Sequence, residues 1–461
     1  MNKTKLGWKF YVSIIMVGFI GQLAWAIENN YINLWVYSQT QNIDAITWMT
    51  YASAVAATLT TFLIGALSDR IGKRKLFISW GYIIWGVSVA IFGLLSRDNM
   101  EKLLGVDYAI LGVGLGMTLA DVIMTFFGSS ANDACFNAFV TDQTNESNRG
   151  KIESILAVLP LIANIAMILL GTLFGAGAVP SESHPEWSAA ETASYLAKPW
   201  LYFFLICGAL TTIVGVISLF LLPKDNCEKK KDGNYWASLI YGFRPKVVKE
   251  NPDLYISLLS FMCFNCAINS FMPYYMVYFQ AGNGGDFVGL GSGMDFMIVM
   301  GVILIVSSII AVVAGLFMDK IGLFKLLPFG LASCAAGLLA LYFSRENWAL
   351  IVSGIVMMSG YLVCTAALGA SIRNETPKNE VGLFQGVRMI FVVLIPMLIG
   401  PAVGSSTFVA VSSIDPSNPT LEKTPNANMF LFALMFIVIS LIPIIWLMIR
   451  KKKIAKTDKL K

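Results

Sequence analysis

A few polar side chains interrupt an apolar sequence at spacings that could serve chemistry. Asp133 lies in "NDACFN", with Asn137 one helical turn later, and Asn265 and Asn269 repeat that spacing. Carboxylate and amide oxygens accept hydrogen bonds from hydroxyl groups, and amide N–H groups donate them. No nucleophile–base pair or metal cluster accompanies these residues, so we expect a binding site rather than an enzyme.

A second polar group lies near the amino terminus, with its members three and four residues apart. It consists of Gln22, Trp25, Glu28, Asn29 and Asn33. On a helix this spacing places them on one side. An indole face can cover the apolar C–H face of a sugar ring, which adds Gln22, Trp25 and Asn29 to the predicted site. Glu28, nearer the outer end, either joins the site or is simply hydrated.

The elements that position these residues follow from composition. The chain has 461 residues, of which 56% are hydrophobic and only 13% are charged, against about 25% charged in soluble domains. Apolar runs of about 20 residues recur, the length that crosses roughly 30 Å of hydrocarbon. Because the backbone in lipid must satisfy its own hydrogen bonds, these runs are helices. We therefore expect an all-α membrane protein.

Twelve transmembrane helices are predicted. They cover residues 9–36, 46–66, 76–96, 117–140, 152–175, 200–222, 254–280, 294–317, 326–343, 349–371, 385–408 and 428–449. Residues 98–116 are partly apolar and either cross the membrane or lie in its outer interface. Asp133 is about 13–14 Å from the predicted inner end of its helix, near Asp142, and hence near mid-membrane.

The orientation follows from Lys and Arg. With the amino terminus in the cytoplasm, 28 of the 33 Lys and Arg residues lie on the inner side. We therefore expect a multi-pass plasma-membrane protein with both termini in the cytoplasm, its basic tail lying against anionic lipid. The net charge of +5 reflects this topology, and no basic patch with interleaved aromatics indicates nucleic-acid binding.

Cofactor signals are weak. Cys263 and Cys266 form a C-x-x-C pair inside an apolar span, His184 is the single histidine, and no P-loop sequence occurs. These features do not match redox, zinc or ATP sites. We expect no cofactor and no metal, and a monomer whose partners are a small-molecule substrate and the lipid bilayer.

Two charged stretches mark an internal repeat. "GALSDRIGKRK" (65–75) and "GLFMDKIGLFK" (315–325) share glycines, an aspartate and a lysine at an offset of 250 residues. Spans one to six therefore repeat as seven to twelve. We predict an N-terminal six-helix bundle (1–222), a cytoplasmic linker (223–252) and a C-terminal six-helix bundle with a basic tail (253–461), which enclose a central cavity.

The first stretch resembles the loop signature of the major facilitator superfamily, G-x-L-x-D-[RK]-x-G-[RK]-[RK]-[RK]. The second copy departs from it at Phe317, Leu323 and Phe324. The resemblance implies a transporter that opens alternately to each side, with this loop as a conformational latch; the alternative is that its charges only set topology. The implied latch residues are Gly65, Asp69, Arg70, Gly72, Arg74, Arg149, Asp319 and Gly322. Gly65 and Gly72 would allow close helix approach and a tight bend.

A second alignment extends the predicted site into the other half. "TNESNRG" (144–150) and "TPKNEVG" (376–382) align at an offset of 232 residues, which maps Asp133 onto Thr365, beside Tyr361. We therefore expect Tyr361 and Thr365 to line the cavity from the C-terminal bundle.

"MTFFGSSANDACFNAFVTD" and "GQLAWAIENN" resemble the glycoside–pentoside–hexuronide cation symporters and the related sucrose porters. That resemblance implies that Asp133 binds sugar. Sodium-coupled members carry two acids in span two, where this chain has Ser53 and Ala57. Coupling, to H+ or Na+, would then depend on Asp133 or Glu28, with Arg388 as their counter-charge or as a latch residue.

The sequence therefore predicts a secondary active transporter for a sugar or glycoside, with proton or cation symport. A drug/proton antiporter is the alternative, disfavoured because span 152–175 lacks a Gly-Pro kink like that of antiporters. A non-transporting membrane sensor on the same scaffold is a further alternative.

Overall fold

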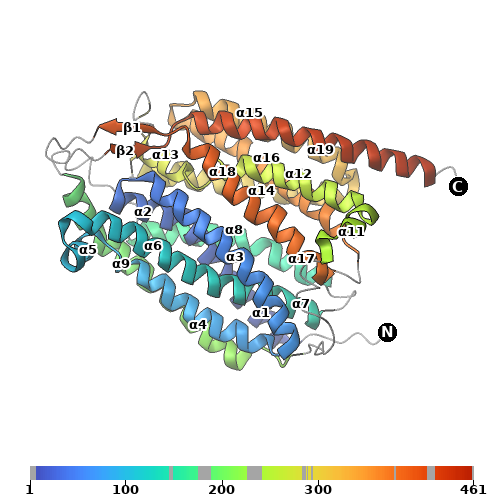
Figure 1. Cartoon of the computed structure of the whole chain (residues 1–461), viewed down its shortest axis with the longest axis horizontal. Coiled ribbons are helices and arrows are strands. Elements are labelled where there is room, and N and C mark those ends of the chain that lie inside the picture. Colours follow the sequence, from blue (N-terminus) through green and yellow to red (C-terminus); the bar gives the residue numbers. More distant parts are fainter. Residues whose placement is uncertain are drawn as a thin grey trace. The chain divides into compact units, whose positions relative to one another are not determined.

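Helices dominate the computed structural model of this chain (Figure 1). The structure describes residues 7–144, 149–174, 188–225, 241–282, 287, 289–291, 294–377, 381–412 and 421–458. Within these ranges, ten helices are long and apolar enough to cross a membrane, and Val158–Phe174 forms a shorter apolar helix. Large apolar side chains such as Phe220, Phe329 and Ile442 are 84%, 76% and 72% exposed. Such a surface suits a lipid environment.

The chain divides into two compact units, which are described separately. The first unit comprises Met1–Gly233, Gly291–Gly293 and Ser412–Lys423, and the second comprises the remainder. The domain boundaries predicted from the repeat stay a prediction. The helices of the first unit are α1 (Trp8–Ala26), η1 (Ile27–Ile32), α2 (Asn33–Thr40), α3 (Ile43–Ile71), α4 (Arg74–Phe92), α5 (Arg97–Leu104), α6 (Val106–Gly128), η2 (Ser129–Phe136), α7 (Asn137–Gln143), α8 (Arg149–Phe174) and α9 (Ala189–Leu221).

The second unit also consists mainly of helices. Its helices are η4 (Tyr241–Phe243), α11 (Pro245–Glu250), α12 (Pro252–Asn269), α13 (Tyr275–Ala281), α14 (Met294–Ile321), α15 (Leu323–Phe343), α16 (Asn347–Glu375), α17 (Val381–Met389), η5 (Ile390–Leu394), α18 (Ile395–Ser405) and α19 (Asn428–Asp458). A small two-stranded sheet, β1 (Val409–Ser412) and β2 (Leu421–Thr424), precedes α19.

Each predicted span overlaps a described helix, but the seventh is divided between α12 and α13, and the fourth is longer than expected. A continuous helix runs from Val106 to Gln143 through α6, η2 and α7. The ambiguous segment 98–116 therefore has two parts. The separate helix α5, capped by Ser96 and without buried residues, ends before Gly105, whose φ of +83° suits glycine. The remainder is the start of α6.

In the part of the chain that the structure describes, three helices contain π-helical turns. These are η1, η2 and η5, and each lies inside an otherwise continuous helix. Such turns are rare and frequently occur at functional sites. Here η1 carries Glu28 and Asn29, and η2 carries Asp133. The irregular backbone therefore coincides with the polar residues singled out from the sequence.

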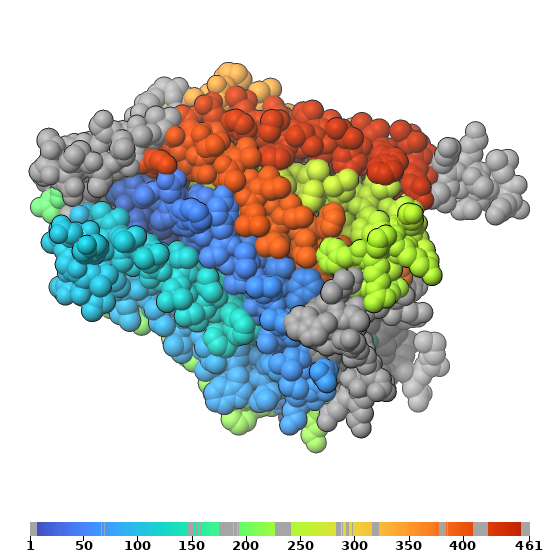
Figure 2. Space-filling model, viewed as in Figure 1, coloured from blue at the N-terminus to red at the C-terminus, as the bar shows by residue number. Residues whose placement is uncertain are grey.

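Close helix packing in the first unit depends on small residues. The α4 and α9 backbones meet where a Cβ added to Gly86 would lie 2.5 Å from the Gly208 carbonyl oxygen. Small residues permit this approach in membrane helices. On the face shown in Figure 2, α3 (blue) lies beside α6 (teal), with which it is in contact. This pairing brings polar residues of the two helices together.

In the second unit, α12 packs against α16, α18 and α19 (Figure 1). The helix is interrupted between Asn269 and Tyr275, and Pro273, a residue type that permits a bend, lies in the interruption. A Cβ at Gly400 would come within 2.6 Å of the Asn269 Cβ atom, so α18 needs glycine at this approach.

The two loop stretches end their helices with matched glycines. Gly72 ends α3 with a φ of +66°, and its N–H bonds the Ser68 carbonyl oxygen at 2.8 Å. Gly322, between α14 and α15, has a φ of +96°. Both conformations favour glycine, so the predicted tight bend at Gly72 is present.

The expectation that Gly65 allows close helix approach is not supported within the first unit. A Cβ there would meet Ala134 at 3.9 Å, which is ordinary contact. The Asp69, Arg149 and Asp319 side chains lie outside the described residues. The latch role proposed for them and for Arg70 stays a prediction.

Candidate functional site

Asp133 is held by hydroxyl and amide donors. Ser129 Oγ donates to Oδ2 at 3.1 Å, and Asn132 Nδ2 donates to Oδ1 at 3.2 Å. The Tyr82 hydroxyl lies 3.1 Å from Asn132 Oδ1 and 2.9 Å from the Val17 carbonyl oxygen. This chain of bonds joins α4, η2 and α1 and fixes the orientation of a half-buried carboxylate.

Aromatic rings lie beside this polar chain. Trp25 packs on Trp85 with ring centroids 5.0 Å apart, and Tyr82 meets Trp85 edge-on at 5.3 Å. A Cβ at Gly128 would lie 2.9 Å from Trp85 and 3.1 Å from Trp25, so glycine is what lets both indoles reach the α6 backbone. The predicted indole and carboxylate therefore belong to one group of side chains in the first unit.

A second carboxylate group is centred on Glu28. Ser53 Oγ and Thr125 Oγ1 lie 3.1 and 3.2 Å from Glu28 Oε1, and 2.8 Å from each other. Asp121, one helical turn before Thr125, is 1% exposed. Glu28 is therefore not simply hydrated: η1, α3 and α6 enclose its carboxylate.

Asp121 is not among the residues predicted from the sequence, because the fourth span is predicted to begin at 117 and so places Asp121 near a helix end. The helix begins at Val106, so Asp121 lies about 22 Å along it. The signal that could have found it is the apolar pattern of residues 106–116, which continues without a break into the predicted span.

The three carboxylates lack a basic partner. Within the described residues, neither Glu28, Asp121 nor Asp133 forms an ion pair with Lys or Arg. Glu28 Oε2 and Asp121 Oδ1 are buried without a hydrogen-bond partner. Uncompensated acids inside a membrane are costly and usually functional.

The amides of the predicted stripe bond their own helices. Asn29 Nδ2 donates to the Trp25 carbonyl oxygen at 2.8 Å, and Asn33 does the same to Asn29 at 3.1 Å. Asn137 donates to the Asp133 carbonyl oxygen at 3.2 Å. Side chains inserted into the i→i−4 ladder disturb a helix, which accounts for the π-helical turns. Gln22 lies half-buried in α1.

The second unit supplies amides and aromatic rings. Asn265 Nδ2 donates to the Val392 carbonyl oxygen in η5 at 2.9 Å, and Asn269 donates to the Asn265 carbonyl oxygen at 2.9 Å. Tyr361 stacks on Phe264 at 6.3 Å. These contacts bring α12, α16 and η5 together. Thr365 lies one helical turn from Tyr361.

Arg388 lies on α17 with an exposed side chain. It belongs to the second unit, whereas Asp133 and Glu28 belong to the first. Its role as their counter-charge stays a prediction.

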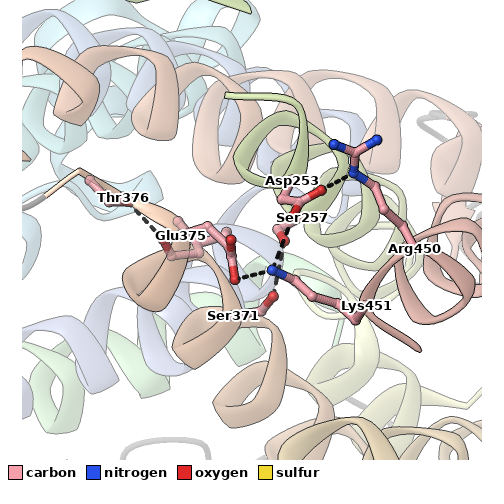
Figure 3. A network of polar contacts seen from close by, with 8 residues as sticks. Asp253, Ser257, Ser371, Glu375, Thr376, Arg450 and Lys451 are labelled. Atoms are coloured by element: carbon pink, nitrogen blue, oxygen red, sulfur yellow. Dashed lines mark hydrogen bonds and ion pairs between the residues drawn. The ribbon is translucent and has the colours of Figure 1, made fainter. Parts of the chain in front are cut away.

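An ionic cluster joins the start of α12 and the end of α16 to α19 in the second unit (Figure 3). Asp253 on α12 pairs with Arg450 and, at 3.1 Å, with Lys451, which pairs with Glu375 at 2.6 Å. Burial would raise the pKa of Asp253, but the bonds and charges of Arg450 and Lys451 outweigh it, so the pKa lies below its usual value.

The first unit has its own ionic contacts at a helix end. Arg74, one of the predicted latch residues, pairs through Nε with Asp142 at 2.6 Å. The Lys75 backbone N–H donates to Asp225 at 3.0 Å. In this structure, Arg74 therefore ties α4 to α7 within a single unit.

The family is shown by sequence comparison: a model described as Major Facilitator Superfamily matches residues 14–344 and 290–461. The chain belongs to this superfamily. It is therefore a multi-pass membrane transporter for a small molecule and not an enzyme. No curated protein sequence matches this chain at a significant level.

Solved structures share the fold at low identity. A mutant form of the nucleoside transporter NupG has a TM-score of 0.67 at 12% identity, over 95% of this chain and 99% of that chain. The xylose transporter XylE from E. coli has a TM-score of 0.62 at 12% sequence identity, over 94% of this chain and 97% of that chain. A bacterial homolog of the human lysosomal transporter Spinster has a TM-score of 0.60 at 14% sequence identity, over 96% of each chain.

Proposed function

We propose that this superfamily member imports a sugar or glycoside by alternating access, in symport with protons or another cation. The observation that carries the proposal is the Asp133 group. A carboxylate oriented by Ser129 and Asn132 can accept bonds from solute hydroxyls. The neighbouring Trp25 indole, half-buried and packed on the fully buried Trp85, offers a face for the apolar side of a sugar ring.

The second unit adds compatible chemistry. Asn265 and Asn269 are half-buried amides, and Tyr361 is a half-buried aromatic ring nearby. Amides both donate and accept, which suits a hydroxyl-bearing ligand. Two structures that share the fold are named for transport of xylose and of nucleosides, both of which carry hydroxyl groups. The resemblance to glycoside–cation symporters points the same way.

We propose the plasma membrane as the location, with both termini in the cytoplasm. The support is the distribution of Lys and Arg, 28 of 33 on one predicted side. We further propose that the protein works as a monomer without a cofactor.

A thermal-shift screen of the detergent-purified protein tests the substrate class. The panel contains monosaccharides, disaccharides, aryl glycosides and dye cations. We expect stabilisation by one sugar or glycoside group, because ligand binding to the folded state raises its melting temperature. Stabilisation by dye cations alone would contradict the proposal and favour the antiporter alternative.

A further inference from the structure

Two buried oxygen atoms in the first unit have no hydrogen-bond partner. They are Glu28 Oε2 and Asp121 Oδ1. The Asp121 side chain is 1% exposed, so bulk solvent does not reach it. A buried acceptor without a donor is strongly unfavourable, and two ionised carboxylates close together add repulsion. The two carboxylate oxygens therefore require a hydrogen-bond donor or a cation that both could bind.

The neighbouring hydroxyl groups cannot donate a hydrogen bond to either of these two oxygens. Ser53 and Thr125 carry one hydroxyl hydrogen each, and their mutual bond uses one of the two. The other donates to Glu28 Oε1, which leaves Oε2 and Asp121 Oδ1 unserved. Two negative charges act on Glu28, those of Asp121 and Asp133. The group that faces Glu28 from α3 is Ser53.

We propose that Glu28 and Asp121 share one proton, and that this pair is the cation site that couples transport. One O–H group on either acid would donate to the orphaned oxygen of the other, satisfying both at once. Binding the proton changes the charge of the pair from −2 to −1, and release restores it, as in other carboxylate dyads. The inference rests on the proposed symport and names its ion.

A proton fits better than a metal cation. A hard cation such as Ca²⁺ takes six to eight oxygen ligands, whereas Glu28 and Asp121 together carry four carboxylate oxygens. Across the described residues, no group of three or more His, Cys, Asp or Glu side chains is placed to hold a metal ion.

The geometry suggests how proton and solute would be linked. Asp121 and Asp133 lie on one continuous helix, about 18 Å apart along its axis. Both charges act on Glu28. A solute that hydrogen-bonds Asp133 changes the negative potential at Glu28 and with it the proton affinity of the pair. The two ligands therefore occupy separate places and communicate through Glu28.

Infrared titration of the purified full-length protein, without any solute, tests the inference. A protonated carboxylic acid has a C=O stretching band that shifts in D₂O, and its amplitude is followed against pH. We expect Glu28→Gln and Asp121→Asn each to lower the midpoint of this band by at least one pH unit, because each removes the partner that shares the proton. The double variant should lose the part of the band that the pair contributes and keep the part that comes from the other acids.

Asp107→Asn is the matched control, since it removes an exposed acid from the same helix. Its titration should equal that of the wild type. Ser53→Ala provides a second measurement in a variant that keeps both acids: it removes a donor to ionised Glu28, so its midpoint should rise. Size-exclusion chromatography and thermal unfolding report whether each variant is folded.

The outcomes separate this inference from the proposed function. If sugars stabilise the protein but neither single variant moves the band, the shared proton is wrong and the transport proposal stands. If the midpoints move as expected but no sugar binds, the pair stands and the substrate class is wrong. A sodium-dependent loss of the protonated band at fixed pH would overturn the assignment of the proton as the coupling ion.

Discussion

The two units use charge in opposite ways. The first places Glu28, Asp121 and Asp133 along the middle of its helices, without a basic partner among the described residues. The second places Asn265 and Asn269 in its interrupted seventh span and keeps Asp253 paired at a helix end. In the transport cycle proposed above, the first unit changes its charge and the second orients a ligand by neutral hydrogen bonds.

Energetics make this difference informative. A charged residue at the bilayer centre costs about 2.5–3.5 kcal/mol on insertion scales. The Asp253 cluster avoids that cost, because it lies at helix ends and includes Arg450 and Lys451 (Figure 3). The three acids of the first unit have no ion pair among the described residues, whereas in the second unit the neutral amide of Asn265 joins α12 to η5.

Asp133→Asn should have the largest effect. The substitution removes the ionised acceptor but keeps the size of the side chain. Hydrogen bonds to charged groups are worth about 1.5–3 kcal/mol, which predicts a roughly 10- to 150-fold loss of solute affinity. The solute-induced thermal shift and uptake into proteoliposomes measure it. Unchanged uptake, with normal membrane insertion, would remove Asp133 from the site.

Asp121→Asn sharpens the comparison by separating coupling from binding. We expect pH-driven accumulation to fall to the external concentration, because the pair no longer carries a proton across. Counterflow exchange, which needs no net proton movement, should persist. Asp107→Asn on the same helix is the control for both assays. Loss of counterflow together with accumulation would place Asp121 in solute binding instead.

The sequence was sufficient to predict the helices, but not to predict the contacts that the acidic side chains make. Apolar runs, Pro273 and Gly72 each act locally, so the spans, the interruption in the seventh span and the turn after α3 could be predicted. Whether Ser53 and Thr125 meet Glu28 depends on the rotation of three helices about their axes, which no local pattern specifies. A shifted helix start was enough to hide Asp121.

Asn265→Ala tests the role of the uncharged amides in the second unit. It removes the bond to the half-buried Val392 carbonyl oxygen in η5. We expect a loss of about 0.5–1.5 kcal/mol in stability, the net value of an ordinary hydrogen bond, measured as a lower melting temperature. The infrared titration should not move, because the first unit is untouched. A shifted titration would contradict the division of roles between the units.

Asp253→Asn is expected to have the smallest effect. The pKa of Asp253 is lowered in the folded protein, so its pairing stabilises the fold above the ordinary pKa and is lost as pH falls through the lowered value. Arg450 is 40% exposed, and such pairs are worth about 0–1 kcal/mol. The melting-temperature difference from wild type should therefore be small and constant between about pH 5 and 8, since Asp has an ordinary pKa of about 3.9. A difference that changes across this range would mean that the cluster at the helix ends titrates like the acids of the first unit, and the contrast between the two units would fail.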